Sequence, residues 1–239
     1  MNTPNVTELA KMIDHSILHP TFTDDDLVNN CAIARKYKVA SVCVKPYAVV
    51  KAKSLLEGSD VKTGCVIGFP HGNSSTDVKV YETETALNDG ATEIDMVVNI
   101  GKVLQQDWAY VEAEIKAVTD TCHRAGALVK VIFENDFLPE DVFKIKLCEI
   151  CTRVNADFVK TSTGYGFVKK PSGDYNYRGA TVADIRLMRL HAGRHVQVKA
   201  AGGVRTLDEL LAVREAGATR CGATATEAIL TEAAGRFPH

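Results

Sequence analysis

The chain lacks the features of a nucleic-acid-binding, membrane-spanning or disulfide-stabilised protein. Its 28 lysines and arginines against 30 acidic residues leave a net charge of -2, and no basic block marks a nucleic-acid surface. No apolar run approaches the roughly 20 residues that cross a bilayer, and the N-terminus shows no signal-peptide pattern. The seven cysteines are odd in number and scattered, which fits reduced thiols. We therefore expect a cytoplasmic protein without nucleic-acid or membrane partners.

Signatures of metal and dinucleotide binding are also missing. Cys148 and Cys151 have the spacing of a zinc or redox motif, but they lie in an expected helix and no second pair completes four ligands. Two pairs of histidines stand four residues apart, yet neither has the glutamate placement of a zinc hydrolase. Gly164-Tyr-Gly lacks the third glycine of a dinucleotide fingerprint. The sequence therefore predicts no metal and no other cofactor.

What the chain does contain is an alternation of strand and helix patterns. Its length of 239 residues, 46% of them hydrophobic, suits one α/β barrel or two small domains. Apolar stretches predict eight buried strands, near residues 12–16, 41–45, 63–69, 93–99, 128–134, 157–162, 196–201 and 219–223. Helical patterns lie between them, at 24–38, 47–57, 76–89, 106–125, 140–154, 181–191, 207–216 and from about 226.

This alternation favours a TIM (β/α)8 barrel, formed as a single domain by residues 1–239. Strands that alternate with helices are joined by right-handed crossovers into a parallel sheet, and eight such units in about 250 residues match the barrel. A doubly wound open sheet is the alternative. Charged residues lie at the ends of several different predicted strands, which favours the barrel because an open sheet concentrates its site at one switch point.

Two lysines lie inside stretches that are predicted to be buried strands: Lys160 in residues 157–164 and Lys199 in residues 196–203. Burying an ammonium group without a partner is costly or lowers its pKa, so such a lysine either pairs with an acid or acts as an amine nucleophile. Asp95, in a third strand-like stretch, is the candidate acid. An interior salt bridge between Lys199 and Asp95 that only stabilises the barrel is the alternative.

Five short segments spread over nearly the whole chain carry a family resemblance. They are Met12-Ile-Asp-His, Gly68-Phe-Pro-His-Gly72, Glu93-Ile-Asp-Met-Val, Phe158-Val-Lys-Thr-Ser-Thr-Gly164 and Val198-Lys-Ala-Ala-Gly-Gly-Val-Arg-Thr206. Together, and in this order, they make the chain resemble the deoxyribose-phosphate aldolases, the DeoC-type class I aldolases. The resemblance implies a TIM barrel of carbohydrate catabolism, a lyase that reversibly cleaves 2-deoxy-D-ribose 5-phosphate into D-glyceraldehyde 3-phosphate and acetaldehyde without a metal.

The resemblance also implies the catalytic residues. Lys160 matches the Schiff-base lysine, whose neutral amine attacks the substrate carbonyl. Lys199 matches the lysine whose positive charge helps to keep that amine neutral, and Asp95 matches the aspartate that shuttles protons with it. Lys130 and Glu134, at even spacing on one predicted strand, match positions near the barrel interior.

Substrate contacts are expected from the ends of several strands. Glycine lets the backbone approach an anion closely, and helix N-termini that follow the last two strands supply N–H donors, so we expect a phosphate site there. For Cys43, a small buried hydrophobic side chain is the alternative reading. The expected substrate-binding residues are Asp14, Cys43, Lys130, Thr161, Gly164, Gly202, Gly203, Gly222 and Thr224.

Three positions depart from the family pattern. Members of the family often have consecutive serines after the last strand, where this chain has Thr224 and Ala225. Some have a lysine directly after the Ser-Thr-Gly motif, where Tyr165 stands, and some end in a tyrosine that this chain lacks. A Schiff-base aldolase for a different or unphosphorylated aldehyde or sugar, and a non-catalytic metabolite-binding barrel, therefore remain as alternative functions.

The segment 167–179 is longer than the usual connection of about 2–6 residues between a strand and the next helix. Because it follows the strand that carries Lys160, it overhangs the expected site. It is either a substrate-facing lid, a contact between copies of the chain, or a tolerated surface insertion. The sequence offers a homodimer as one expectation, without indicating its face.

Overall fold

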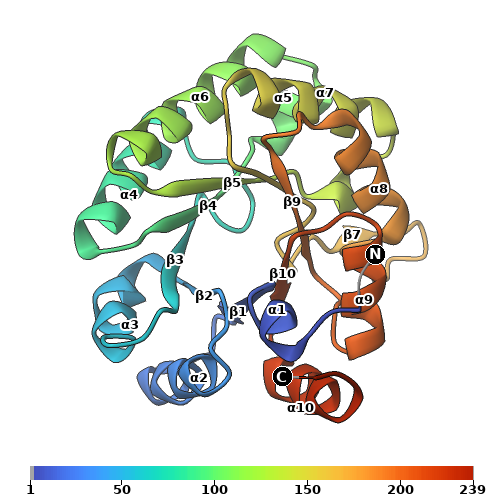
Figure 1. Cartoon of the computed structure of the whole chain (residues 1–239). Coiled ribbons are helices and arrows are strands. Elements are labelled where there is room, and N and C mark those ends of the chain that lie inside the picture. Colours follow the sequence, from blue (N-terminus) through green and yellow to red (C-terminus); the bar gives the residue numbers. More distant parts are fainter. Residues whose placement is uncertain (1–2, 239) are drawn as a thin grey trace.

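Eight parallel strands close into a barrel in the computed structural model, which describes residues 3–238 (Figure 1). Their order around the barrel is β1 (Ile13–Ile17), β10 (Arg220–Ala223), β9 (Gln197–Ala201), β6 (Phe158–Lys160), β5 (Leu128–Ile132), β4 (Glu93–Val97), β3 (Lys62–Ile67) and β2 (Ser41–Val44). The closed, parallel arrangement confirms the predicted TIM barrel and excludes the open sheet.

The helices that follow the strands form the outer layer of the barrel (Figure 1). In α6 (Trp108–Arg124), for example, Val111, Ile115, Val118 and Cys122 share one face and are fully buried, as expected for an amphipathic helix on a sheet. The remaining outer helices that were predicted are α2 (Asp24–Lys36), α3 (Val49–Leu55), α4 (Thr76–Asp89), α7 (Asp141–Arg153), α8 (Val182–His191), α9 (Leu207–Glu215) and α10 (Thr226–Arg236).

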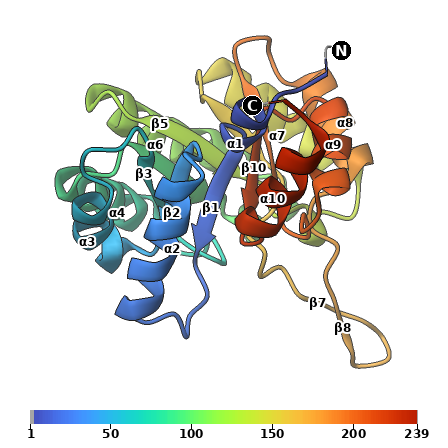
Figure 2. The ribbon, with the colours of Figure 1, turned by 60° about the horizontal axis from the view of Figure 1, so that its bottom comes forward.

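Several short elements were not predicted. Each is too short for its hydrophobic period to be read from the sequence. They are α1 (Val6–Ala10), α5 (Ile100–Leu104), the 3-10 turns η1 (Pro46–Ala48) and η2 (Asn135–Phe137), and the strands β7 (Val168–Lys169) and β8 (Tyr175–Asn176). The last two pair as an antiparallel hairpin within residues 167–179, and this hairpin projects from the barrel (Figure 2).

All seven cysteines are free and buried. Cys148 and Cys151 lie in α7 and are fully enclosed by the apolar core, in agreement with a packing role. Within residues 3–238, no helix has the length and apolar character needed to cross a membrane.

Candidate active site

The register of the strands brings the ionisable side chains together inside the barrel. Lys160 lies opposite Lys199 across β6 and β9, and Lys199 lies opposite Arg220 across β9 and β10. On the other side, Asp95 lies opposite Lys130 across β4 and β5. Residues that the sequence separates by up to about a hundred positions therefore meet because the sheet closes on itself.

Asp95 joins three lysines. Its Oδ2 lies 2.7 Å from Lys160 Nζ and 2.7 Å from Lys199 Nζ, and its Oδ1 lies 2.8 Å from Lys130 Nζ. None of the four side chains is more than 3% exposed. Burial alone would raise the pKa of Asp95, but attraction by Lys130, Lys160 and Lys199 outweighs it and holds this pKa well below its usual value.

A second carboxylate, Asp14, lies beside the first. Its Oδ2 is 2.5 Å from Lys199 Nζ, and its Oδ1 accepts hydrogen bonds from Arg220 Nη1 and Ser41 Oγ, both at 2.6 Å. Burial opposes the charged form, yet the nearby cations Lys130, Lys199 and Arg220 lower the pKa of Asp14 overall. Asp14 is therefore an ionised anchor for Lys199.

These side chains form an interior charge cluster in which positive groups are in excess. Its members are the cations Lys130, Lys160, Lys199 and Arg220 and the carboxylates Asp14, Glu93 and Asp95. If all were ionised the cluster would carry one uncompensated positive charge in a medium of low dielectric constant. Loss of one proton from one lysine removes that excess.

Lys160 is the lysine best placed to lose the proton. Its only carboxylate partner among the described residues is Asp95, whereas Lys199 also contacts Asp14 and Lys130 contacts three acids. Burial and then repulsion by Lys199 lower the pKa of Lys160, despite attraction by Asp95. For Lys199, burial is outweighed by attraction from Asp14 and Asp95, which raises its pKa. The contacts and these pKa shifts therefore single out Lys160 as the lysine of the cluster that gives up its proton most readily.

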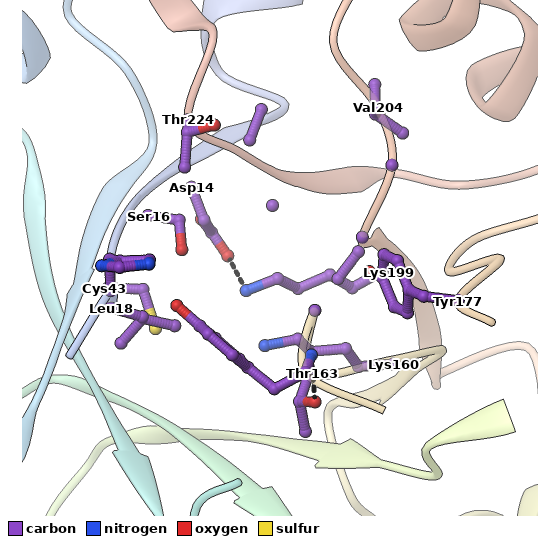
Figure 3. Close-up of a pocket in the computed structure, with 18 of the residues that line it drawn as sticks. Asp14, Ser16, Leu18, Cys43, Lys160, Thr163, Tyr177, Lys199, Val204 and Thr224 are labelled. Atoms are coloured by element: carbon purple, nitrogen blue, oxygen red, sulfur yellow. Dashed lines mark hydrogen bonds and ion pairs between the residues drawn. The ribbon is translucent and has the colours of Figure 1, made fainter. Parts of the chain in front are cut away.

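A cavity of about 500 Å³ opens above this cluster. In Figure 3, Lys160 and Lys199 extend their nitrogens toward its centre. Most of the predicted site residues line it: Asp14, Cys43, Lys160, Gly164, Lys199, Gly202, Gly203, Gly222 and Thr224. Asp95 does not line the cavity and reaches it only through the two lysines that it contacts.

Two predicted substrate-binding residues lie elsewhere. Lys130 is fully buried beneath the cavity and its charged contacts are Asp14, Glu93 and Asp95, so its position does not support a direct contact with substrate. Thr161 is also fully buried, and its hydroxyl group bonds the backbone of Ala201 at 3.0 Å. It ties β6 to β9 and thereby fixes the spacing of the two active-site lysines.

One end of the cavity suits an anion. Gly164, Gly202 and Gly203 have φ values of +93°, +85° and +85°, in the left-handed region that favours glycine. Next to them, α10 begins after Ala225, which has no side chain that could accept a hydrogen bond from the first N–H groups of the helix. Backbone donors and a close approach are thus available without a further hydroxyl group at position 225.

Cys43 lines the cavity as a protonated thiol. Burial, followed by the charge of Asp95, raises its pKa to about 11. It packs in a small apolar cluster with Leu18 and Val66. This environment favours the reading of Cys43 as a small buried hydrophobic side chain.

Glu134 is a buried acid at the edge of this site, with a left-handed backbone at φ 59°. Thr163 donates to it from its backbone nitrogen, at 3.2 Å, and from its hydroxyl group. Burial raises the pKa of Glu134 to about 7, even though both bonds from Thr163 favour the carboxylate. Glu134 is therefore expected to titrate near neutral pH.

A first prediction concerns the pH dependence of stability. Because the pKa of Glu134 in the folded protein exceeds its ordinary value of 4.5, the stability that it contributes is complete below pH 4.5 and is lost as the pH rises through about 7. Relative to Glu134→Gln, the wild type should lose on the order of 3 kcal/mol of unfolding free energy across this window. Urea denaturation at pH 4.5 and 8 measures it, and exposed Glu84→Gln serves as the control. If the unfolding free energies of Glu134→Gln and the wild type change by the same amount between pH 4.5 and 8, the prediction is wrong.

Sequence reasoning missed several residues of the site. Glu93 lies two residues before Asp95, so its inward orientation could have been found from the period of two along the strand. Arg220 also begins a buried strand, but only closure of the barrel shows that it contacts Asp14 and Glu93. Tyr177 lines the cavity from the hairpin, and no local pattern places it there.

The chain is similar to known proteins over most of its length. Residues 9–231 match the model of the DeoC/LacD family aldolases. The chain is 52% identical to the deoxyribose-phosphate aldolase of Rhodopirellula baltica over 226 residues, 95% of this chain and 89% of that protein. It is 48% identical to that of Thermococcus gammatolerans, over 90% and 92% of the two chains. The deoxyribose phosphate aldolase of Aeropyrum pernix, whose structure is described as a unique tetramer, superimposes with a TM-score of 0.84 at 30% identity, over 95% and 92% of the chains.

Proposed function

The chain belongs to the DeoC/LacD aldolase family, and from that premise we propose that it cleaves 2-deoxy-D-ribose 5-phosphate reversibly into D-glyceraldehyde 3-phosphate and acetaldehyde. The reaction proceeds through a Schiff base on Lys160. The observation that supports this role is the uneven charge of the interior cluster, in which Lys160 has the fewest carboxylate partners and a lowered pKa. A neutral amine at the floor of a cavity is what nucleophilic attack on a carbonyl requires.

The proposed reaction uses Lys160 and Lys199, which both line the cavity. The Lys160 amine adds to the C1 carbonyl of the open-chain sugar, and the resulting carbinolamine accepts a proton at its hydroxyl group and loses water to give the protonated imine. The C3 hydroxyl group then loses its proton, the C2–C3 bond breaks, and its electron pair enters the imine to form an enamine while glyceraldehyde 3-phosphate leaves. Protonation of the enamine at C2 and hydrolysis release acetaldehyde and restore Lys160.

Proton transfer is assigned to the pair of Lys199 and Asp95. The ammonium group of Lys199 lines the cavity and lies 2.7 Å from Asp95 Oδ2, whereas Asp95 itself is covered. Protons thus pass between substrate and Lys199, with Asp95 and Asp14 stabilising the charge on Lys199. The phosphate group lies at the opposite end, against the glycine turns at 164 and 202–203 and the start of α10.

Trapping of the imine tests the proposal. The protein is incubated with acetaldehyde or deoxyribose 5-phosphate and borohydride, and the modified peptide is identified by mass spectrometry. A stable adduct on Lys160 is expected with both compounds. An adduct on another lysine, or none, would overturn the assignment. Faster cleavage of deoxyribose 5-phosphate than of unphosphorylated deoxyribose distinguishes the phosphate-specific enzyme from an aldolase for unphosphorylated sugars.

A second prediction concerns Lys199. Replacing it with leucine removes one cation, so that the cluster balances only when Lys160 is protonated. We expect kcat to fall roughly 10²- to 10⁴-fold, and the rise of activity with pH to shift to higher pH because repulsion by Lys199 no longer lowers the pKa of Lys160. A pH profile of kcat measures both effects. Lys199→Arg, which keeps the positive charge, should leave the rise of kcat at the same pH as in the wild type. If the rise also stays at that pH in Lys199→Leu, Lys199 does not lower the pKa of Lys160.

The proposed partners are the sugar phosphate and its aldehyde products. We also propose a cytoplasmic location, which the scattered cysteines, odd in number, support. A homodimer is retained as a proposal on the assembly of the chain in solution.

A further inference from the structure

The hydroxyl group of Tyr177 is buried and has no hydrogen-bond partner among the described residues. Tyr177 also lines the cavity that holds Lys160 and Lys199. A buried donor without a partner destabilises a folded protein, so such a group calls for an explanation. A ligand that enters the cavity and accepts this bond would supply one.

The hairpin of residues 167–179 projects into solvent at its tip (Figure 2), but its base, which carries Tyr177, is bonded to the barrel. The two Oδ atoms of Asp136 accept bonds from the backbone nitrogens of Arg178 and Gly179, at 2.8 and 2.9 Å. The Ala180 nitrogen donates to the Gly202 carbonyl at 2.9 Å. The Tyr177 ring also packs against that of Phe167, with centroids 5.6 Å apart.

The hydroxyl group lies over the two glycine turns that we assign to the phosphate. A Cβ atom on Gly202 would overlap Tyr177 Oη, and one on Gly164 would stand 3.7 Å from it. Both glycines line the cavity, and Figure 3 shows the Tyr177 ring at its wall near Lys199. The absence of a side chain at 202 is therefore what leaves room for the phenol to approach the backbone there.

We propose that Tyr177 determines specificity for a phosphorylated substrate by donating a hydrogen bond from its hydroxyl group to the phosphate. This inference rests on the proposed function and adds to it a donor from the hairpin. A phosphate dianion offers only acceptors, and a bond to a charged group is stronger than one between neutral groups. Burial, and then the charge of Glu134, raise the pKa of Tyr177, so the phenol keeps the proton that it donates.

The neighbouring residues explain why a donor is useful at this place. Ala225 at the start of α10 offers no hydroxyl group, and Tyr165 offers no positive charge. Thr224 and Arg205 are further side-chain donors among the residues that line the cavity. The hairpin thus adds the hydroxyl group of Tyr177 to the backbone donors of the glycine turns.

Tyr177→Phe is the direct test, because it removes the hydroxyl group and keeps the ring against Phe167. We expect kcat/KM for deoxyribose 5-phosphate to fall roughly 10- to 100-fold, mainly through a higher KM, and cleavage of unphosphorylated deoxyribose to stay unchanged. Tyr175→Phe is the matched control, since Tyr175 is an exposed tyrosine of the same hairpin. Equal losses for the two sugars, or no loss, would overturn the proposal.

Thermal unfolding separates a ligand contact from a structural role. Without ligand, Tyr177→Phe should melt at the same temperature as the wild type or higher, because it removes an unpartnered buried donor. Inorganic phosphate should raise the melting temperature of the wild type more than that of the variant. A variant that melts lower without ligand and gains as much from phosphate would show that the hydroxyl group is structural.

Imine trapping with acetaldehyde, which carries no phosphate, keeps this inference distinct from the proposed function. Equal adducts on Lys160 in wild type and Tyr177→Phe are expected. If the wild type forms no adduct, the proposed function is overturned and the role of Tyr177 with it. If both proteins form the adduct and cleave the phosphorylated sugar equally well, only the role of Tyr177 is overturned.

Discussion

Replacing Lys160 with leucine should lower kcat for deoxyribose 5-phosphate by roughly 10⁴-fold or more, because no other group can form the imine. Lys199 and Lys130 cannot substitute for it, since attraction by Asp14 and Asp95 raises the pKa of each despite burial. The measurement is the release of glyceraldehyde 3-phosphate in a coupled assay, together with borohydride trapping.

The same variant should remain folded. Removing Lys160 leaves three cations facing three carboxylates, and Asp95 keeps its bonds to Lys130 and Lys199. We therefore expect an unfolding free energy within about 1 kcal/mol of the wild type. A circular dichroism spectrum and a urea curve provide the control. Cleavage at a near-normal rate by a folded Lys160→Leu protein would rule out the Schiff-base assignment.

Replacing Lys130 with methionine, unlike replacing Lys160, should mainly destabilise the fold, with a loss of about 3–5 kcal/mol in unfolding free energy. Lys130 is fully buried and contacts Asp95 at 2.8 Å and Glu93 at 2.6 Å. Its removal leaves Arg220 as the cation that contacts Glu93, and the buried cluster then has one positive charge too few while Lys160 is neutral. Protonation of Lys160 would restore the total charge but not its position, because Lys160 contacts Asp95 and not Glu93.

The shift of the urea midpoint at constant m-value measures this loss. Lys116→Met is the matched control, because Lys116 pairs with Asp120 on the exposed face of α6 and such pairs contribute about 0.5 kcal/mol. A loss below about 1 kcal/mol for Lys130→Met would mean that the interior charge cluster tolerates the loss of one cation. Lys130 and Lys160 would then differ less in their contribution to stability than their contacts indicate.

The barrel and the buried position of Lys160 and Lys199 were both predictable because each has a local signal. The outer helices and strands have hydrophobic periods over five or more residues in most cases, and every barrel strand lies within two residues of its predicted bounds. Lys160 and Lys199 are charged residues in otherwise apolar stretches, which alone marks them as paired or reactive. Their approach to Asp95 was likewise expected from the resemblance and is present in the structure.

What could not be predicted depends on contacts between distant segments. Asp14 meets Arg220 only because the first and last barrel strands pair, and the excess positive charge is visible only once Arg220 and Glu93 are included. The position of Tyr177 requires the hairpin to fold back over the glycine turns. Burial of Lys130 likewise depends on how the barrel interior is filled, and the resemblance that named it as a substrate-binding residue does not show that it lies beneath the cavity.

The burial of every cysteine has a practical consequence for chemical labelling. Six of the seven thiols are enclosed in the apolar core and Cys43 alone lines the cavity, so the outer surface of the described residues presents no thiol to an alkylating reagent. A cysteine introduced at exposed Ser172, in the tip of the hairpin, would therefore be the readily accessible attachment point. A fluorophore or a solid support could be coupled there without first removing any native cysteine.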